Sequence, residues 1–181
     1  IINPYIYNYL TSFNLNNYIK DHFDFPEKGI VFKDWLPLLQ KPEAFNEVIN
    51  QISNWDQFNN ADAIIAIDAR GFILGSCIAY RLSKPLILAR KPGKLPGELI
   101  TKSYQLEYGK NELSIQKDSL AEFDNFLIID DLLATGGTVN SVVNILEEAK
   151  KNIVGLFILI ELLKLKGREN FNFPIKSIVS F

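Results

Sequence analysis

The stretch of the chain with the clearest chemical potential is a pair of acids followed by a run of small residues. Asp130 and Asp131 follow four apolar residues, and Ala134-Thr135-Gly136-Gly137-Thr138 comes just before a helical pattern. Glycine amides and an unpaired helix N-terminus bind anions, and threonine hydroxyls add further donors. Carboxylates repel a phosphate but accept hydrogen bonds from adjacent hydroxyls. The stretch therefore predicts a phosphate cradle beside a diol site, and a ribose 5-phosphate presents both groups.

Each part of this stretch also has an ordinary structural interpretation. Thr-Gly-Gly-Thr by itself is typical of a helix cap and turn, and two acids are typical of a solvated strand end. The buried strand, the acid pair and the immediate helix together favour the cradle. Neither GxxxxGK[ST] nor GxGxxG occurs in the chain, which excludes a P-loop and a glycine-rich dinucleotide-binding turn.

A second charged turn follows another apolar run. Asp68-Ala69-Arg70-Gly71 comes after residues 63–67 and opens a helical pattern. An arginine fork binds polyphosphate oxygens, and a glycine lets a ligand or a backbone approach closely. Taken alone, the pattern favours a solvent-facing arginine at a helix start.

Cations gather in the next part of the chain. Between residues 81 and 102 there are six cations and one acid, a local excess of five in a chain of net charge −2. A solvated basic loop is the ordinary interpretation, and a field for a polyanion such as pyrophosphate is the alternative. Proline and glycine at 92, 93, 96 and 97 are typical of a mobile lid.

Composition excludes several classes of chemistry. The 181 residues contain one cysteine, Cys77, and one histidine, His22, so an internal disulfide and a multi-histidine metal site are excluded. The near-neutral charge argues against general nucleic-acid binding. No apolar run reaches the roughly 18 residues of a membrane span, and no basic signal-like start is present. We therefore expect a cytoplasmic protein that binds neither nucleic acid nor membrane.

The elements around these motifs predict an α/β fold. Short apolar runs alternate with helical faces, which is typical of a parallel sheet flanked by helices, and an alternating segment predicts an inserted antiparallel ribbon. Strands are expected at 30–34, 63–67, 86–88, 126–129 and 153–160, ribbon strands at 104–108 and 113–115 with a turn at 109–111, and helices at 6–13, from 42, at 72–82 and at 139–149.

Residues 126–138 resemble the phosphoribosyl-pyrophosphate (PRPP) binding motif of type I phosphoribosyltransferases, and residues 132–138 are similar to the members that act on adenine. This resemblance implies that Asp130 and Asp131 hold the ribose hydroxyls and that Ala134-Thr135-Gly136-Gly137-Thr138 holds the 5-phosphate. Asp68-Ala69-Arg70 is similar to the pyrophosphate loop of that family. A cis peptide between Asp68 and Ala69 is then implied, although Ala69 departs from the Ser or Glu expected there.

Three more segments carry the resemblance, which spans about residues 24–170. Arg90-Lys91-Pro92-Gly93-Lys94-Leu95-Pro96 matches a basic loop of the family that faces pyrophosphate, which implies Arg90, Lys91 and Lys94 as the anion donors. Residues 103–109 match a segment in which Glu107 lies near the purine, as proton acceptor or as an orienting group, and Tyr108 belongs to the lid. Residues 25–34 are similar to an adenine-binding hood, which implies main-chain contacts from Val31 and Lys33 and stacking by Phe32. Lys33 stands where the family usually has arginine.

The resemblance implies one function for the whole chain. It implies transfer of the phosphoribosyl group from PRPP to adenine, giving AMP and pyrophosphate, with Mg²⁺ as cofactor held mainly by the substrate and with a homodimer as the assembly. Arg70 and Glu107 are the expected catalytic residues. We expect a single domain over residues 1–181, with the N-terminal helix and hood in 1–35 and the lid and ribbon in 91–117.

Two other functions are compatible with the fold. A phosphoribosyltransferase for 6-oxopurines or xanthine would need a donor facing O6 of the base, commonly a lysine side chain. A non-catalytic PRPP or purine sensor would be expected to carry a further DNA-binding segment or to lack Glu107 or Arg70. Both of these residues are present in the sequence, which favours the enzyme.

Overall fold

The computed structural model describes residues 14–106 and 109–181, and the chain divides into two units, Ile1–Glu47 and Val48–Phe181. The helix expected at 6–13 lies outside the described residues. No helix in the described ranges is long and apolar enough to cross a membrane.

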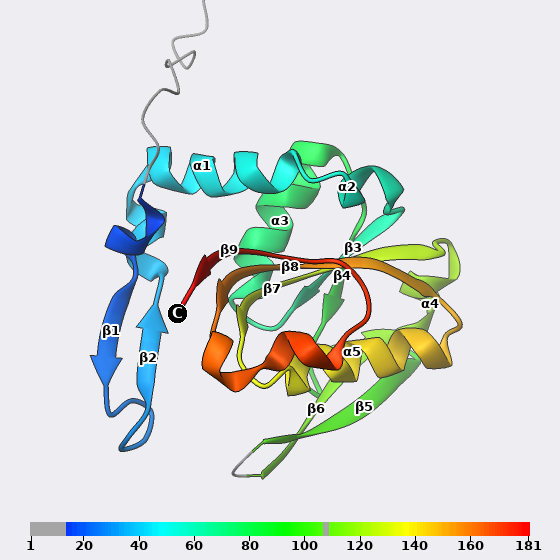
Figure 1. Ribbon diagram of the computed structural model, residues 1–181. Coiled ribbons are helices and arrows are strands. Elements are labelled where there is room, and N and C mark those ends of the chain that lie inside the picture. The colour runs from blue at the N-terminus through cyan, green and yellow to red at the C-terminus, as the bar shows by residue number, and fades with distance from the viewer. Residues whose placement is uncertain (1–13, 107–108) are drawn as a thin grey trace, which may run out of the picture. The chain divides into compact units, whose positions relative to one another are not determined.

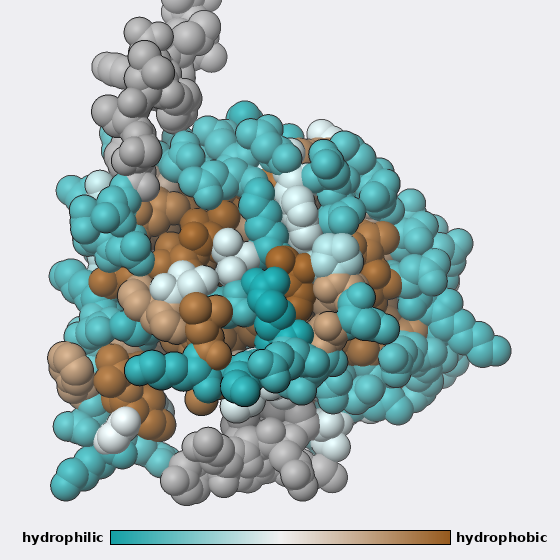
Figure 2. All heavy atoms as spheres, in the orientation of Figure 1, coloured by the Kyte–Doolittle hydropathy of each residue, from teal (hydrophilic) through white to brown (hydrophobic). Residues whose placement is uncertain are grey.

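The first unit contains a two-stranded antiparallel ribbon of β1 (Lys20–Phe23) and β2 (Val31–Asp34). The 3-10 turns η1 (Leu15–Tyr18) and η2 (Leu36–Gln40) come before and after the ribbon, and α1 (Pro42–Ser53) begins in this unit. The strand expected at 30–34 is β2. Its partner β1 was not expected, because its four residues are all exposed and show no apolar alternation. Figure 2 shows apolar side chains at the tip of this ribbon, where Phe23 and Phe25 are exposed.

The second unit contains a five-stranded parallel sheet in the order β4-β3-β7-β8-β9 (Figure 1). Four of these strands correspond to expected apolar runs. Three of them, β3, β7 and β8, are buried along most of their length, which is typical of a sheet covered on both faces, whereas half-buried and buried residues alternate in β4. The fifth, β9, was not expected, because its residues are mostly half-buried at the sheet edge. The strands are β3 (Ala63–Ile67), β4 (Leu86–Ala89), β7 (Asn125–Leu133), β8 (Asn152–Glu161) and β9 (Ile175–Ser180).

Helices cover both faces of the sheet (Figure 1). α3 (Gly71–Leu82) packs so closely on β3 that a Cβ on Gly75 would lie 2.5 Å from the Cβ of Ala66. α5 (Gly137–Glu148) covers the other face, where its side chains join a core with Ile65 and Ile128. This arrangement follows from the right-handed crossover between parallel strands. Two short helices, α2 (Gln57–Asn60) and α4 (Lys117–Ala121), complete the unit together with the 3-10 turns η3 (Leu163–Leu165) and η4 (Gly167–Asn170).

The inserted ribbon consists of β5 (Leu99–Leu106) and β6 (Gly109–Gln116), paired antiparallel from Leu99↔Gln116 to Leu106↔Gly109. It is longer than the expected ribbon, and β6 already begins at Gly109, where a turn was expected. Ile100, Leu113 and Ile115 join the core beneath α5, so the base of the ribbon is part of the packed unit.

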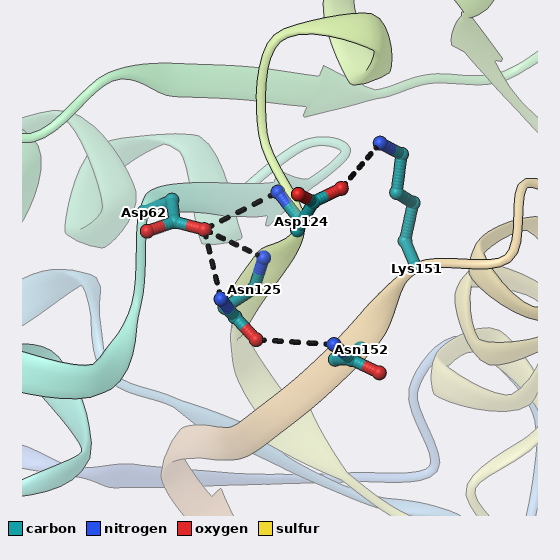
Figure 3. A network of polar contacts seen from close by, with 5 residues as sticks. All are labelled: Asp62, Asp124, Asn125, Lys151 and Asn152. Atoms are coloured by element: carbon teal, nitrogen blue, oxygen red, sulfur yellow. Dashed lines mark hydrogen bonds and ion pairs between the residues drawn. The ribbon is translucent and has the colours of Figure 1, made fainter.

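The amino ends of three strands are tied together on the edge of the sheet where these strands begin (Figure 3). One oxygen of Asp62 accepts from the main-chain N–H groups of Asp124 and Asn125, at 3.2 and 2.9 Å, and from the Asn125 side chain at 3.0 Å. These hydrogen bonds, with those of Asn125 contributing most, lower the pKa of the Asp62 carboxyl. Asn152 donates to Asn125, which extends the network to β8.

Candidate active site

A cavity of about 370 Å³ opens at the carboxyl ends of β3 and β7. Ligands of open parallel sheets bind at this edge. The lining comes from three stretches that the sequence separates widely: the turn after β3, one lysine after β4, and the passage from β7 into α5. The lining residues are Asp68, Ala69, Arg70, Lys91 and every residue from Asp130 to Val139.

The acid pair lies inside β7 and is buried, with 6% of Asp130 and 7% of Asp131 exposed. The expectation of a strand end at the acids was wrong, because β7 continues to Leu133 by pairing with β8. The main-chain N–H of Asp131 donates to Asp130 Oδ1 at 2.8 Å. Burial, and then the charge of Asp131, raise the pKa of the Asp130 carboxyl well above its ordinary value. The site thus holds two carboxyl groups, of which Asp130 resists ionisation.

Arg70 lies beside this pair. Its Nε is 2.7 Å from Asp131 Oδ2, and both side chains are largely buried. The peptide between Asp68 and Ala69 is cis, as the resemblance implied. Gly71 opens α3 next to β7, and a Cβ there would lie 3.0 Å from Asp130 Oδ1 and 3.2 Å from the Ile129 carbonyl. Glycine therefore allows the close approach that brings Arg70 to the acid pair.

The glycine and threonine run forms the entry to α5. Gly136 has φ +88° and is the N-cap residue, and no side chain caps the helix there. The left-handed conformation favours glycine. The alternative interpretation, in which a threonine side chain caps this helix, is therefore wrong. The first-turn N–H groups of a helix lack intrahelical partners and carry partial positive charge, which attracts an anion. All the residues of this loop line the cavity.

Comparison with known proteins gives the family. The model of the phosphoribosyl transferase domain matches residues 34–180. A curated adenine phosphoribosyltransferase from a strain of Prochlorococcus marinus is 55% identical over 166 residues, covering 92% of this chain and 96% of that protein. This chain belongs to the adenine phosphoribosyltransferase family. A more distant curated relative in the family, from Mycoplasmopsis synoviae, is 44% identical over 92% of this chain and 99% of its own length.

Solved structures of the family agree with the fold. Adenine phosphoribosyltransferase from Thermoanaerobacter pseudethanolicus has a TM-score of 0.88 at 39% identity, over 92% of this chain and 98% of that one. The enzyme from Saccharomyces cerevisiae, complexed with D-2,5-dideoxy-2,5-imino-altritol 1,6-bisphosphate and adenine, has a TM-score of 0.85 at 32% identity, over 90% and 95%. The expected α/β fold with a central parallel sheet and an inserted ribbon is confirmed.

The basic segment of this family member does not gather at the cavity. Lys84 donates to the Ala61 carbonyl at 2.6 Å. Ala61 precedes β3, so this contact lies at the amino ends of the strands, at the edge of the sheet opposite the cavity. Lys102 forms an ion pair with Glu148, at the end of α5. The expectation that the whole excess of charge faces one polyanion was therefore wrong, because β4 separates Lys84 from Arg90 and Lys102 lies on β5 beside the end of α5.

The three cations proposed for pyrophosphate have different environments. Lys91 is exposed and lines the cavity. Arg90 Nε is 3.3 Å from Asp68 Oδ2, its Nη1 donates to the Lys94 carbonyl at 3.3 Å, and its guanidinium lies 5.6 Å from the Phe72 ring centroid. Lys94 itself is exposed and is not among the lining residues. Arg90 thus supports the Asp68 turn, and of the three cations Lys91 reaches the cavity.

The other expected site residues do not line this cavity in the part of the chain that the structure describes. Val31, Phe32 and Lys33 lie on β2 in the first unit, where Lys33 Nζ is 2.8 Å from Asp21 and Phe32 packs edge-on against Phe25 at 5.2 Å. Glu107 and Tyr108 lie outside the described residues. The roles given to these residues stay predictions.

Sequence reasoning missed a buried ion pair near the loop of residues 134–138. Arg168 holds the buried Glu161 by two hydrogen bonds, at 2.8 and 2.5 Å, and Ser177 donates to the same carboxylate at 2.7 Å. The bonds from Arg168, followed by that from Ser177, lower the pKa of Glu161 against the opposing effect of burial. The sequence shows an acid at the end of an apolar strand, seven residues before an arginine, within a segment that matches the C-terminal part of the family, but no pairing was expected from it.

Proposed function

We propose that this enzyme transfers the 5-phosphoribosyl group of PRPP to adenine, giving AMP and pyrophosphate. The observation that carries the proposal is a cavity in which the uncapped N-terminus of α5 lies beside a buried acid pair and Arg70. The N-terminus of α5 can bind a phosphate, and the acid pair can accept hydrogen bonds from vicinal hydroxyls. Arg70 can bind a second anionic group. PRPP carries all three groups on one ribose ring.

In this proposal the ribose 5-phosphate is held by the backbone of Ala134-Thr135-Gly136-Gly137-Thr138 and by the threonine hydroxyls. Asp130 and Asp131 bind the 2- and 3-hydroxyls. Asp131 is held by Arg70, so its carboxylate accepts a hydrogen bond from a ribose hydroxyl in a defined orientation. Fixing both ends of the ribose places C1 relative to the base and removes much of the entropic cost of the encounter.

The chemical step is a substitution at C1. The bond from C1 to the pyrophosphate oxygen breaks with its electron pair on pyrophosphate, and the N9 lone pair of adenine forms the new bond to C1. Arg70 and Lys91, supported by Arg90 and Lys94, stabilise the negative charge that develops on the leaving group. The N9 proton leaves to a base or to water, and Glu107 is the residue proposed to accept it or to orient the ring.

The hood residues of the first unit are proposed to bind the base. An extended backbone at Val31 and Lys33 presents an N–H and a carbonyl, which match the N1 acceptor and the N6 donor of adenine. Phe32 is proposed to stack on the ring. Tyr108 is proposed to close over the site with the ribbon and so to exclude water.

Mg²⁺ is the proposed cofactor, and the donor chemistry of the cavity fits it. Mg²⁺ prefers oxygen ligands and binds through one or two carboxylates together with substrate phosphates. Asp130 and Asp131 bring carboxyl oxygens to the cavity lining, and the ion itself is proposed to be held mainly by the phosphates of PRPP and pyrophosphate. Once bound, the ion neutralises charge on the pyrophosphate group. A homodimer and a cytoplasmic location are the other expectations that stay proposals.

The function is tested by measuring pyrophosphate release from PRPP and Mg²⁺ with adenine, hypoxanthine, guanine and xanthine offered separately. Turnover with adenine alone is the expected result. Turnover with only a 6-oxopurine or xanthine would contradict adenine as the substrate, although phosphoribosyl transfer would still be supported. PRPP binding without turnover of any base would favour a non-catalytic sensor and would overturn the proposed enzymatic activity.

A further inference from the structure

The C-terminal segment of residues 163–171 lies against the back of the phosphate loop. The Nδ2 of Asn170 donates to the Thr135 carbonyl at 2.8 Å. The aromatic ring of Phe171 and the amide of Asn170 are both close to Gly136, since a Cβ on Gly136 would lie 3.1 and 3.2 Å from them. The segment therefore contacts the loop at the two residues that precede α5.

The hydrogen bond acts on one peptide plane. The peptide between Thr135 and Gly136 is trans, so its carbonyl and its N–H point in opposite directions. With the Thr135 carbonyl bound to Asn170, the N–H of Gly136 is directed away from the Asn170 amide. Thr135, Gly136 and Gly137 all line the cavity, so the orientation of this plane belongs to the anion site itself.

The segment is pressed against the loop and anchored to the sheet. A Cβ on Gly167 would collide with the Ala134 carbonyl, so only glycine allows this approach. Arg168 follows directly and binds Glu161 at the end of β8 and the Ile175 carbonyl at the start of β9, the latter at 2.9 Å. Asn170 is thus carried by a short segment whose position is set by two strands of the sheet.

We propose that Asn170 is a positioning residue for phosphoribosyl transfer. It holds the Thr135–Gly136 peptide plane so that the amides at the start of α5 keep the orientation that binds the 5-phosphate. This inference rests on the proposed function, because it assigns the loop to the phosphate of PRPP. Asn170 touches no reacting atom, and its effect passes through the backbone of the loop.

The test is a comparison of Asn170→Ala with the wild-type protein and with Asn172→Ala. Asn172 is an exposed asparagine two residues further on. We expect Asn170→Ala to raise the KM for PRPP about two- to tenfold, which corresponds to the net loss of one hydrogen bond. The KM for adenine should stay within about twofold of the wild-type value, and the affinity for AMP should fall by the same factor as that for PRPP.

A second variant separates positioning from folding. Asn170→Asp keeps the size of the side chain but cannot donate to a carbonyl, and Asn172→Asp controls for the added charge. An unchanged PRPP KM in both Asn170 variants of an active enzyme overturns the inference. Equal losses for PRPP and adenine, accompanied by a lower melting temperature, would show a purely structural role and overturn it as well. A wild-type protein inactive with every base would instead refute the proposed function.

Discussion

Arg70 Nε lies 2.7 Å from Asp131 Oδ2, and the two residues come from different elements, the start of α3 and the last third of β7. Both line the cavity. The ion pair places one cation and one anion where the proposed substrate brings an anion and hydroxyl donors. In the proposed reaction each partner thus orients the other, Asp131 for a ribose hydroxyl and Arg70 for the leaving pyrophosphate.

The first prediction concerns the charge of Asp131. Asp131→Asn weakens the acceptor for a ribose hydroxyl and removes the anion that holds Arg70. We expect the KM for PRPP to rise about tenfold or more, because hydrogen bonds to charged groups are the stronger ones. Initial rates over a range of PRPP concentrations check this. Asp118→Asn, an exposed acid at the start of α4, is the control and should leave the KM unchanged. Equal PRPP kinetics in both variants would contradict the assignment.

The second prediction concerns pH and Asp130. Because its folded pKa is raised, its contribution to stability is most favourable below the unfolded pKa of about 3.9 and is lost as the pH rises towards the folded pKa. Asp130→Asn removes this titration and keeps an oxygen that accepts from the Asp131 amide. The variant should be more stable than the wild-type protein near about pH 8, and the difference should shrink towards about pH 4. Urea unfolding at both pH values checks this, and a difference independent of pH would contradict it.

The third prediction concerns the left-handed glycine at the start of α5. Gly136→Ala adds both backbone strain and a Cβ at 3.2 Å from the Gly167 carbonyl. Gly97 has φ +83° with no atom within 4 Å of a Cβ, so Gly97→Ala is a control for strain alone. We expect Gly97→Ala to cost about 1 kcal/mol and Gly136→Ala about 2–4 kcal/mol in the free energy of unfolding. Denaturant unfolding measures both, and equal losses would argue against the tight contact.

The fourth prediction concerns Glu161 behind the loop. Its pKa is lowered, so its contribution to stability is present above the unfolded value and lost as the pH falls through the folded one. Glu161→Gln should lower the free energy of unfolding by about 1–3 kcal/mol near neutral pH, and the loss should diminish on acidification. Glu169→Gln is the matched control, because Glu169 is exposed and 3.9 Å from Lys166. Similar losses in both variants would show that the pairing with Arg168 contributes nothing specific.

Much of the site could be predicted because its central part is contiguous. Asp130, Asp131 and the following loop occupy nine successive residues, so the order of strand, acids, glycines and helix is visible in the sequence itself. The same holds for the Asp68–Arg70 turn after β3. Periodicity identified β3, β7 and the α5 face for the same reason, since each is a local pattern of apolar residues.

The positions of the cations in residues 81–102 could not be predicted from the local sequence. Six cations within 22 residues look like one field, yet Lys84 and Lys102 are held at different places in the unit. β4 runs between Lys84 and Arg90 and carries these two cations to opposite edges of the sheet, whereas Lys102 lies on β5 beside the end of α5. Net charge along the sequence therefore said little about the charge around the cavity.

The sequence by itself determined the family, the α/β class and the composition of the loop at residues 134–138, because these depend on residues that are neighbours along the chain. Only the tertiary structure decided that the acids are buried within β7, that Arg70 meets Asp131, and that Asn170 holds the Thr135 carbonyl 35 positions away. Such contacts depend on how strands and helices pack. Packing follows from the combined burial of many side chains, and no single motif encodes it.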